Sequence, residues 1–223
     1  MKTISTIFKT SIVAIAVFAS TGASAQVDLK SNVLGLAAND YGLSGEYSIS
    51  ENMSVQLGMM YSINKFGASS SLADTDADIK WTGFKVIPSF RFYFSPDDPT
   101  EGFFVEPYVR YKSQKRSGMS ANIPVDANGD YDENWVNNTN AIKYENRSYT
   151  NSRTKIGFGL AIGKKWVHDS GFVFETFAGF GKNADSEVKY SDTDVQDYYK
   201  DILTFDSPIQ VHGRLGLSVG FRF

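Results

Sequence analysis

The sequence contains no cysteine among its 223 residues. This absence excludes a disulfide framework, a thiol nucleophile and the lipidated cysteine of a lipoprotein. Histidine is almost as scarce, with two residues, so the sequence offers little for a histidine-based metal centre. Beyond the N-terminal region there is no run of about 18 apolar residues, which excludes a helical membrane span.

The N-terminus has the three-part layout of a secretory signal peptide. Lys2 and Lys9 supply positive charge, residues 11–18 form a short apolar run, and the small residues 23–25 precede Gln26. The alternative is an ordinary buried N-terminal helix. We expect residues 1–25 to be removed and residues 26–223 to form one domain. The net charge then falls from −3 to −5, and this acidity argues against nucleic acid as a partner.

The last segment, residues 209–223, alternates apolar and polar residues for about fifteen positions. Its apolar face contains Ile209, Val211, Leu215, Leu217, Val219, Phe221 and Phe223. Such a strand is longer than typical globular strands, and its face, apolar apart from Gly213, needs either a second sheet or a bilayer to cover it. The same period of two recurs in the segments 43–49, 55–64, 84–94, 103–112, 155–162 and 172–181.

Segment 29–38 is less regular. Leu34, Leu36 and Ala38 share one parity, whereas Leu29 and Val33 share the other, so the register of the first strand stays open. Together these segments predict an all-β fold, an eight-stranded antiparallel up-and-down transmembrane β-barrel with long surface loops. A soluble β-sandwich is the alternative.

The connections alternate in length as a barrel with both termini in the periplasm requires. Residues 50–52, 95–101 and 168–170 are short and are expected on the periplasmic side. The expected surface loops are 39–40, 66–80, 114–152 and 182–208, of which three are long. This alternation is independent of hydrophobicity, and it favours the membrane barrel over a compact soluble domain.

The C-terminal residues 217–223 resemble the insertion signal of outer-membrane proteins, an alternating strand that ends in an aromatic residue. The resemblance implies that Leu217, Val219, Phe221 and Phe223 are read by the barrel-insertion machinery through strand pairing. Aromatic residues also gather near the predicted periplasmic ends, as in an interfacial girdle. They are Phe92, Phe94, Phe103, Trp166, Phe172, Phe221 and Phe223.

Three blocks of sequence, 88–94, 102–111, and 163–166 together with 171–172, resemble a family of small outer-membrane barrels known only as a domain of unknown function. In size the chain is also similar to the OmpA/OmpX class. The resemblance covers most of the mature chain. It implies fold and location and brings no catalytic residues.

Charged residues on the lumen-facing parity predict an interior charge network. An eight-stranded barrel is just wide enough for side chains, and buried charges there need partners. We expect a network that fills the barrel, with an anion-conducting pore or cationic ligand site as the alternative. The predicted members are Glu46, Lys85, Arg91, Glu106, Arg110, Lys155, Glu175, Arg214 and Arg222, with Lys112 and Lys165 on the same parity.

Two further motifs suggest chemistry. His168-Asp169-Ser170 resembles the His-x-Ser spacing of an outer-membrane lipid A deacylase, but it falls in a predicted periplasmic turn, and His212 has no nearby serine or carboxylate in the sequence pattern. No catalytic residue is therefore predicted. Asp126, Asn128, Asp130 and Asp132 resemble the start of a calcium loop, without the glycine and glutamate that an EF-hand requires. A polar turn is the alternative, and weak calcium binding at surface loops is the only cofactor hypothesis.

The sequence thus favours a non-enzymatic outer-membrane barrel with an envelope-structural or surface-interaction role through loops 114–152 and 182–208. These loops are rich in aromatic residues, which suit recognition. They are Tyr131, Trp135, Tyr144, Tyr149, Tyr190, Tyr198, Tyr199 and Phe205. A narrow channel for small solutes is the second hypothesis, and a lipid-modifying enzyme is the third. The expected partners are outer-membrane lipid and lipopolysaccharide, periplasmic chaperones, the insertion machinery and an unidentified surface ligand.

Overall fold

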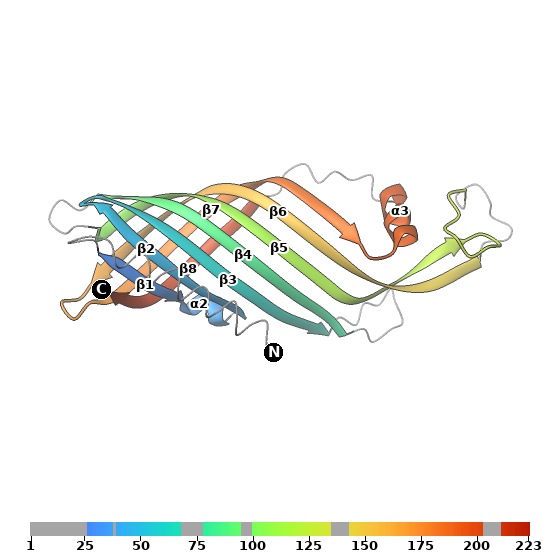
Figure 1. Cartoon of the computed structure of the whole chain (residues 1–223), viewed down its shortest axis with the longest axis horizontal. Coiled ribbons are helices and arrows are strands. Elements are labelled where there is room, and N and C mark those ends of the chain that lie inside the picture. Colours follow the sequence, from blue (N-terminus) through green and yellow to red (C-terminus); the bar gives the residue numbers. More distant parts are fainter. Residues whose placement is uncertain (1–25, 38, 68–77, 95–99, 135–142, 203–210) are drawn as a thin grey trace.

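The computed structural model describes residues 26–37, 39–67, 78–94, 100–134, 143–202 and 211–223. The predicted signal peptide, residues 1–25, lies outside them. Eight antiparallel strands pair in sequence order and close into a barrel, because β1 also pairs with β8 (Figure 1). The strands are β1 (Val27–Asn32), β2 (Asp40–Ser50), β3 (Met53–Gly67), β4 (Asp78–Tyr93), β5 (Gly102–Val125), β6 (Lys143–Val167), β7 (Phe172–Tyr190) and β8 (Val211–Arg222). The predicted fold class is confirmed.

Exposure alternates along the strands as the period of two predicts. Large apolar side chains point outward and form a belt around the barrel, whereas the lumen-facing positions between them are buried. The belt includes Val55, Leu57, Phe84, Val109, Phe158, Leu160, Ile162, Phe180 and Leu215, together with the aromatic residues of the predicted periplasmic girdle. A closed barrel with such a belt buries its apolar exterior in lipid, so the chain forms an integral membrane barrel.

Two short helices complete the described structure, α2 (Val33–Ala37) after β1 and α3 (Thr193–Ile202) after β7. Among the described residues, no helix has both the length and the apolar character needed to cross a membrane.

Helix α2 explains the irregular pattern of segment 29–38. Strand β1 ends at Asn32, where the side-chain Oδ1 accepts a hydrogen bond from the backbone N–H of Gly35, and the chain turns into a single helical turn. Only residues 27–32 alternate, with Asp28 and Lys30 buried in the lumen. Val33 and Leu34 belong to the helix and not to the strand, so they do not follow the strand's period of two.

The predicted bounds of the surface loops are wrong. The strand ladder between β5 and β6 continues to the pair Val125–Lys143, so most of residues 114–152 is a β-hairpin. Strand β7 runs to Tyr190 and α3 follows, so much of residues 182–208 is also regular structure. Likewise β3 reaches Gly67 and β4 begins at Asp78. Strands β5 and β6 therefore project beyond the barrel at the end opposite the C-terminus (Figure 1).

Aromatic rings from β5 fill the lumen against glycines of β6. A Cβ added at Gly163 would collide with the ring of Phe104, and one at Gly159 would collide with Tyr108. Both rings are almost fully buried. Small residues on one strand thus make room for large ones on its neighbour, as close packing inside a narrow barrel requires.

Candidate functional site

The centre of the lumen is occupied by the guanidinium of Arg91, on β4, which is fully buried. Its Nε and Nη2 donate to Glu106 at 2.9 and 2.7 Å, and Nη1 lies 2.9 Å from Glu46. Glu175 accepts a two-pronged pair of bonds, from Nη1 at 2.6 Å and from Nη2 at 3.0 Å. One planar cation therefore bridges three carboxylates from three other strands, a geometry that only arginine provides.

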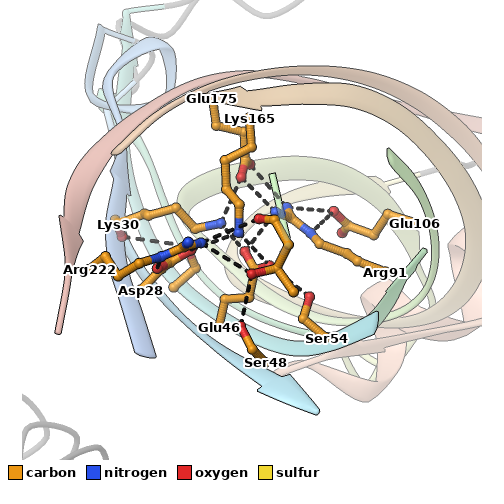
Figure 2. Close-up of polar contacts among 12 residues, drawn as sticks. Asp28, Lys30, Glu46, Ser48, Ser54, Arg91, Glu106, Lys165, Glu175 and Arg222 are labelled. Carbon is orange, nitrogen blue, oxygen red and sulfur yellow. Dashed lines mark hydrogen bonds and ion pairs between the residues drawn. The ribbon is translucent and has the colours of Figure 1, made fainter. Parts of the chain in front are cut away.

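A second layer lies toward the end of the barrel that holds the C-terminus and centres on Asp28 of β1. Arg222 donates to its carboxylate from Nε at 2.7 Å and from Nη2 at 3.0 Å. The Nζ of Lys165 bridges Asp28 at 2.7 Å and Glu46 at 2.8 Å. Lys30 completes the connection, because its Nζ contacts Glu46 and lies 2.6 Å from Glu175 (Figure 2).

All eight strands contribute to this lumen network. We use that name for five cations, four carboxylates and two hydroxyl groups: Asp28, Lys30, Glu46, Ser54, Arg91, Tyr93, Glu106, Lys165, Glu175, Arg214 and Arg222. Most of its members are at most 1% exposed. Near balance of charge and many hydrogen bonds offset the large desolvation cost of these groups. The network therefore fills the barrel at this level and joins the strands around its whole circumference.

The structure brings together six of the nine predicted lumen residues: Glu46, Arg91, Glu106, Glu175, Arg214 and Arg222. The other three lie nearer the outer end of the barrel. Lys85 pairs with Asp40, and Arg110 donates to the side chain of Asn183 at 2.8 Å. Lys155 lies opposite Lys112 in the β5–β6 ladder.

Sequence reasoning missed Asp28 and Lys30. Both lie on β1, whose register was open, and both are fully buried. The signal was present in the short alternation of residues 27–30, in which two charged residues flank Leu29. A strand of six residues followed by a helix gave that alternation too little length to stand out.

The strands that project beyond the membrane belt form a small folded unit, which we call the head. It comprises residues 117–134, 143–150 and 193–202, from β5, β6, the tip between them and α3. Its core is apolar and buried, with Ile123 and Val195 fully inaccessible. The buried members are Ala121, Ile123, Val125, Tyr149 and Val195, and Met119, Tyr190 and Tyr198 pack against them.

Polar contacts fasten α3 to the hairpin. Asp192 precedes the helix, and its Oδ1 accepts from the backbone N–H groups of Asp194 and Val195, the usual capping pattern. Arg147 of β6 then donates to Asp194 at 2.7 Å and to the backbone carbonyl of Gly129. One arginine thus connects the hairpin, its tip and the helix.

The aromatic residues expected to form a recognition surface mostly build this unit instead. Tyr149 is buried, and Tyr131 packs edge-to-face on Tyr198 at 6.0 Å between ring centroids. Tyr144 remains exposed on the outer face of the hairpin. Trp135 and Phe205 lie outside the described residues.

The calcium motif is part of the hairpin tip. Asp126 Oδ1 accepts from the backbone N–H groups of Asn128 and Asp130, and Asp132 accepts from Asn134. The hydrogen bond from Asp130 contributes most to holding the pKa of Asp126 below its usual value. These carboxylates therefore stabilise a turn. Within the described ranges, no three His, Cys, Asp or Glu side chains gather as a metal site would require.

The two histidines lie far from any arrangement typical of hydrolysis. His168 and Ser170 are 3.0 Å apart in an exposed turn, where the backbone N–H of Ser170 also donates to His168. His212 faces the lumen, and its Nε2 lies 3.1 Å from the hydroxyl of Tyr108. A catalytic triad needs a base that is held by a third group and that contacts a nucleophile. Neither histidine has these partners among the described side chains.

The C-terminal strand closes the barrel. Phe223 and Val27 exchange backbone hydrogen bonds of 2.9 and 3.2 Å. Leu217, Val219, Phe221 and Phe223 point outward, and Phe221 packs edge-to-face on Phe172 at 5.7 Å. The residues of the predicted insertion signal thus form the last strand of the closed ring.

Solved structures of outer-membrane barrels resemble this chain. CarO of Acinetobacter baumannii matches with a TM-score of 0.48 and 9% identity over 89% of this chain and 97% of its own. A major outer membrane protein of Thermus thermophilus matches with a TM-score of 0.45 and 13% identity, over 89% and 98% of the two chains. Neisserial surface protein A gives a TM-score of 0.37 and 13% identity over 89% and 96%. No protein of curated function matches the sequence.

The sequence also matches one family model, and the match covers residues 9–203, most of the chain. This range spans seven of the eight strands and the helix of the head. The family has no assigned activity, in agreement with the resemblance that the sequence motifs indicated. The chain belongs to the family described as protein of unknown function DUF3575.

Proposed function

We propose that this protein is a closed outer-membrane barrel that carries a rigid head on the cell surface. Its role is then structural or adhesive: the barrel anchors the head, and the head makes contacts outside the membrane. The observation that carries this proposal is the combination of a filled lumen with a head that has its own buried core.

The filled lumen argues against transport. Solutes that cross a barrel need an aqueous path, and eight strands leave room for little more than side chains. Here Arg91 and its three carboxylate partners are at most 1% exposed. Opening a path would separate buried ion pairs, which costs about 3–5 kcal/mol for each pair that loses a partner.

The head is suited to recognition because it is ordered before any partner binds. Its core contains Ile123 and Val195 at no exposure, and Arg147 connects its three parts. A preorganised surface loses less conformational entropy on binding than a disordered loop of the same length. The β5–β6 hairpin also raises the tip well beyond the other strands, where it can reach a partner (Figure 1).

The proposed partners follow from the exterior. The apolar belt contacts outer-membrane lipid, and the polar positions above it contact lipopolysaccharide. Assembly proceeds through periplasmic chaperones and the barrel-insertion machinery, which pairs with the C-terminal strand. The surface ligand is a macromolecule or glycan outside the cell. We propose no catalytic activity.

A shortened variant tests the role of the head. Residues 117–150 are replaced by Asn-Gly, so that the opposed pair Arg116 and Asn151 is joined by a two-residue hairpin turn. Cells that express the intact protein are compared with cells that express the variant for binding to arrays of extracellular-matrix proteins and glycans. We expect binding that is lost with the head. Equal binding by both, at equal surface amounts, would contradict the proposal.

A further inference from the structure

A row of three lysines crosses the lumen face near the outer end of the barrel. Lys85 of β4 lies directly opposite Lys112 of β5, and Lys112 lies directly opposite Lys155 of β6. Directly opposed residues on one face of a sheet have Cβ atoms about 5 Å apart, where like charges destabilise the pairing. We call these residues the lysine row. Such a row carries a cost in stability that a structural role alone does not explain.

The charges of the row are only partly compensated. Lys85 pairs with Asp40. Among the described side chains, no carboxylate pairs with Lys112 or Lys155. Just below them, Arg110 is 9% exposed and donates to the neutral side chain of Asn183, while its Nε is buried without a hydrogen-bond partner among the described residues. At the same level, the Nδ1 of His212 on β8 has no hydrogen-bond partner in the described part of the chain.

This excess contrasts with the lumen network beneath it. There, five cations face four carboxylates, and nearly every charge is satisfied. At the outer end, Arg110, Lys112 and Lys155 lie on two adjacent strands, and none of them forms an ion pair with a carboxylate among the side chains that the structure describes. Lys112 and Lys155 are only half-buried, so an ion arriving from outside the cell can reach them.

We propose that Arg110, Lys112 and Lys155 form an anion-binding site for a phosphate or sulfate group, inside the outer mouth of the barrel. A tetrahedral oxyanion has several acceptor oxygens and up to two negative charges, which match three converging donors better than a single carboxylate does. Arginine binds such groups through its planar fork, and lysine binds them as a compact point charge. The lumen network closes the barrel below the site, so the site holds its ligand rather than conducting it.

Calorimetric titration with inorganic phosphate tests the site. The refolded protein is kept in a maltoside detergent, which contains no phosphate of its own. We expect binding by the wild type, and binding at least about tenfold weaker for Lys112→Gln and for Lys155→Gln, because each removes one charged hydrogen-bond donor. Lys115→Gln is the matched control: Lys115 lies on the same strand but is exposed on its outer face, and its loss leaves binding unchanged.

A thermal unfolding measurement distinguishes binding from a structural role. Without phosphate, Lys112→Gln should unfold at a temperature no lower than the wild type, because it relieves repulsion within the lysine row. Added phosphate should raise the unfolding temperature of the wild type and of Lys115→Gln only. Loss of stability in phosphate-free Lys112→Gln, or the absence of phosphate binding by the wild type, would overturn the proposal.

A second arm identifies the source of the anion. The titration is repeated in phosphatidylcholine nanodiscs with and without lipopolysaccharide. Loss of phosphate binding when lipopolysaccharide is present assigns the site to a lipid phosphate. Unchanged binding assigns it to a soluble phosphate or sulfate compound. Equal binding by wild type and by Lys155→Gln in both kinds of nanodisc would overturn the site itself.

Discussion

Replacement of Arg91 by methionine should destabilise the barrel strongly. Methionine has a similar length and no charge, so the change removes the cation with little loss of volume. Arg91 makes five close contacts to Glu46, Glu106 and Glu175. Each carboxylate retains another cation, from Lys30, Lys165 or Arg214, which limits the loss.

The expected cost follows from that geometry. Removing one partner of a buried pair costs about 3–5 kcal/mol, because the other charge is left in a medium of low dielectric. Three carboxylates each lose one of their cations and keep another, so we expect a total in this range and not three times as much. The unfolding equilibrium then shifts by a factor of roughly 10² to 10⁴ toward the unfolded state.

The assay is urea unfolding of the refolded protein in lipid vesicles, followed by tryptophan fluorescence. Arg91→Lys should lie between the wild type and Arg91→Met, because lysine keeps the charge and loses the planar fork. Arg116→Met is the control: its guanidinium stacks on Trp81 at 3.8 Å near the head, a contact of about 1 kcal/mol. If Arg91→Met unfolds within about 1 kcal/mol of the wild type, the lumen network is not what holds the barrel together.

Three further predictions concern the head, the C-terminus and the hairpin tip. Ile123→Ala should cost about 2–4 kcal/mol of head stability and leave the barrel intact. Protease cleavage should therefore increase in residues 117–150 only. Cleavage throughout the barrel would contradict this prediction. Deletion of Phe223 should reduce the protein in outer-membrane fractions, whereas the belt variant Phe180→Ala should assemble normally; equal assembly of the two would count against the insertion signal. Asp126→Ala should loosen the hairpin tip, which is measured as faster hydrogen exchange at Asp130. Calcium should leave the exchange rate unchanged in the wild type and in the variant. Slower exchange with calcium in the wild type alone would instead support a calcium site.

The barrel could be predicted because lipid covers its exterior. Within the belt, a bilayer favours apolar residues at outward positions such as Val55 and Phe221, and the narrow lumen favours positions that are small, paired or closely packed. That constraint produces a period of two in the sequence. The apolar alternation ends near Tyr111 and Ile156, and the outward positions beyond them, such as Lys115 and Ser152, are polar.

The head could not be predicted because it lies beyond the lipid that imposes this pattern. Beyond the belt, outward residues such as Asn146 and Ser148 are polar and exposed, so the ladder continues without the apolar alternation that would reveal it. The core of the head joins Ile123 of the hairpin to Val195 of a helix far along the chain, a contact that no local pattern contains.

The sequence predicted which charged residues face the lumen, but it did not predict which of them pair with one another. Parity placed Arg91, Glu106 and Glu175 inside, but which carboxylate meets which cation depends on the stagger between strands. The contribution of β1 was hidden because α2 interrupts its pattern after Asn32. The two charges that complete the network, Asp28 and Lys30, come from that strand.

Single-channel recording in planar lipid bilayers tests the closed barrel most directly. The refolded wild-type protein, with its head intact, should give no current steps above the lipid baseline at moderate voltage, because the lumen network leaves no aqueous path around Arg91. Regular, reproducible steps from the wild type would contradict the closed barrel and make the protein a narrow channel.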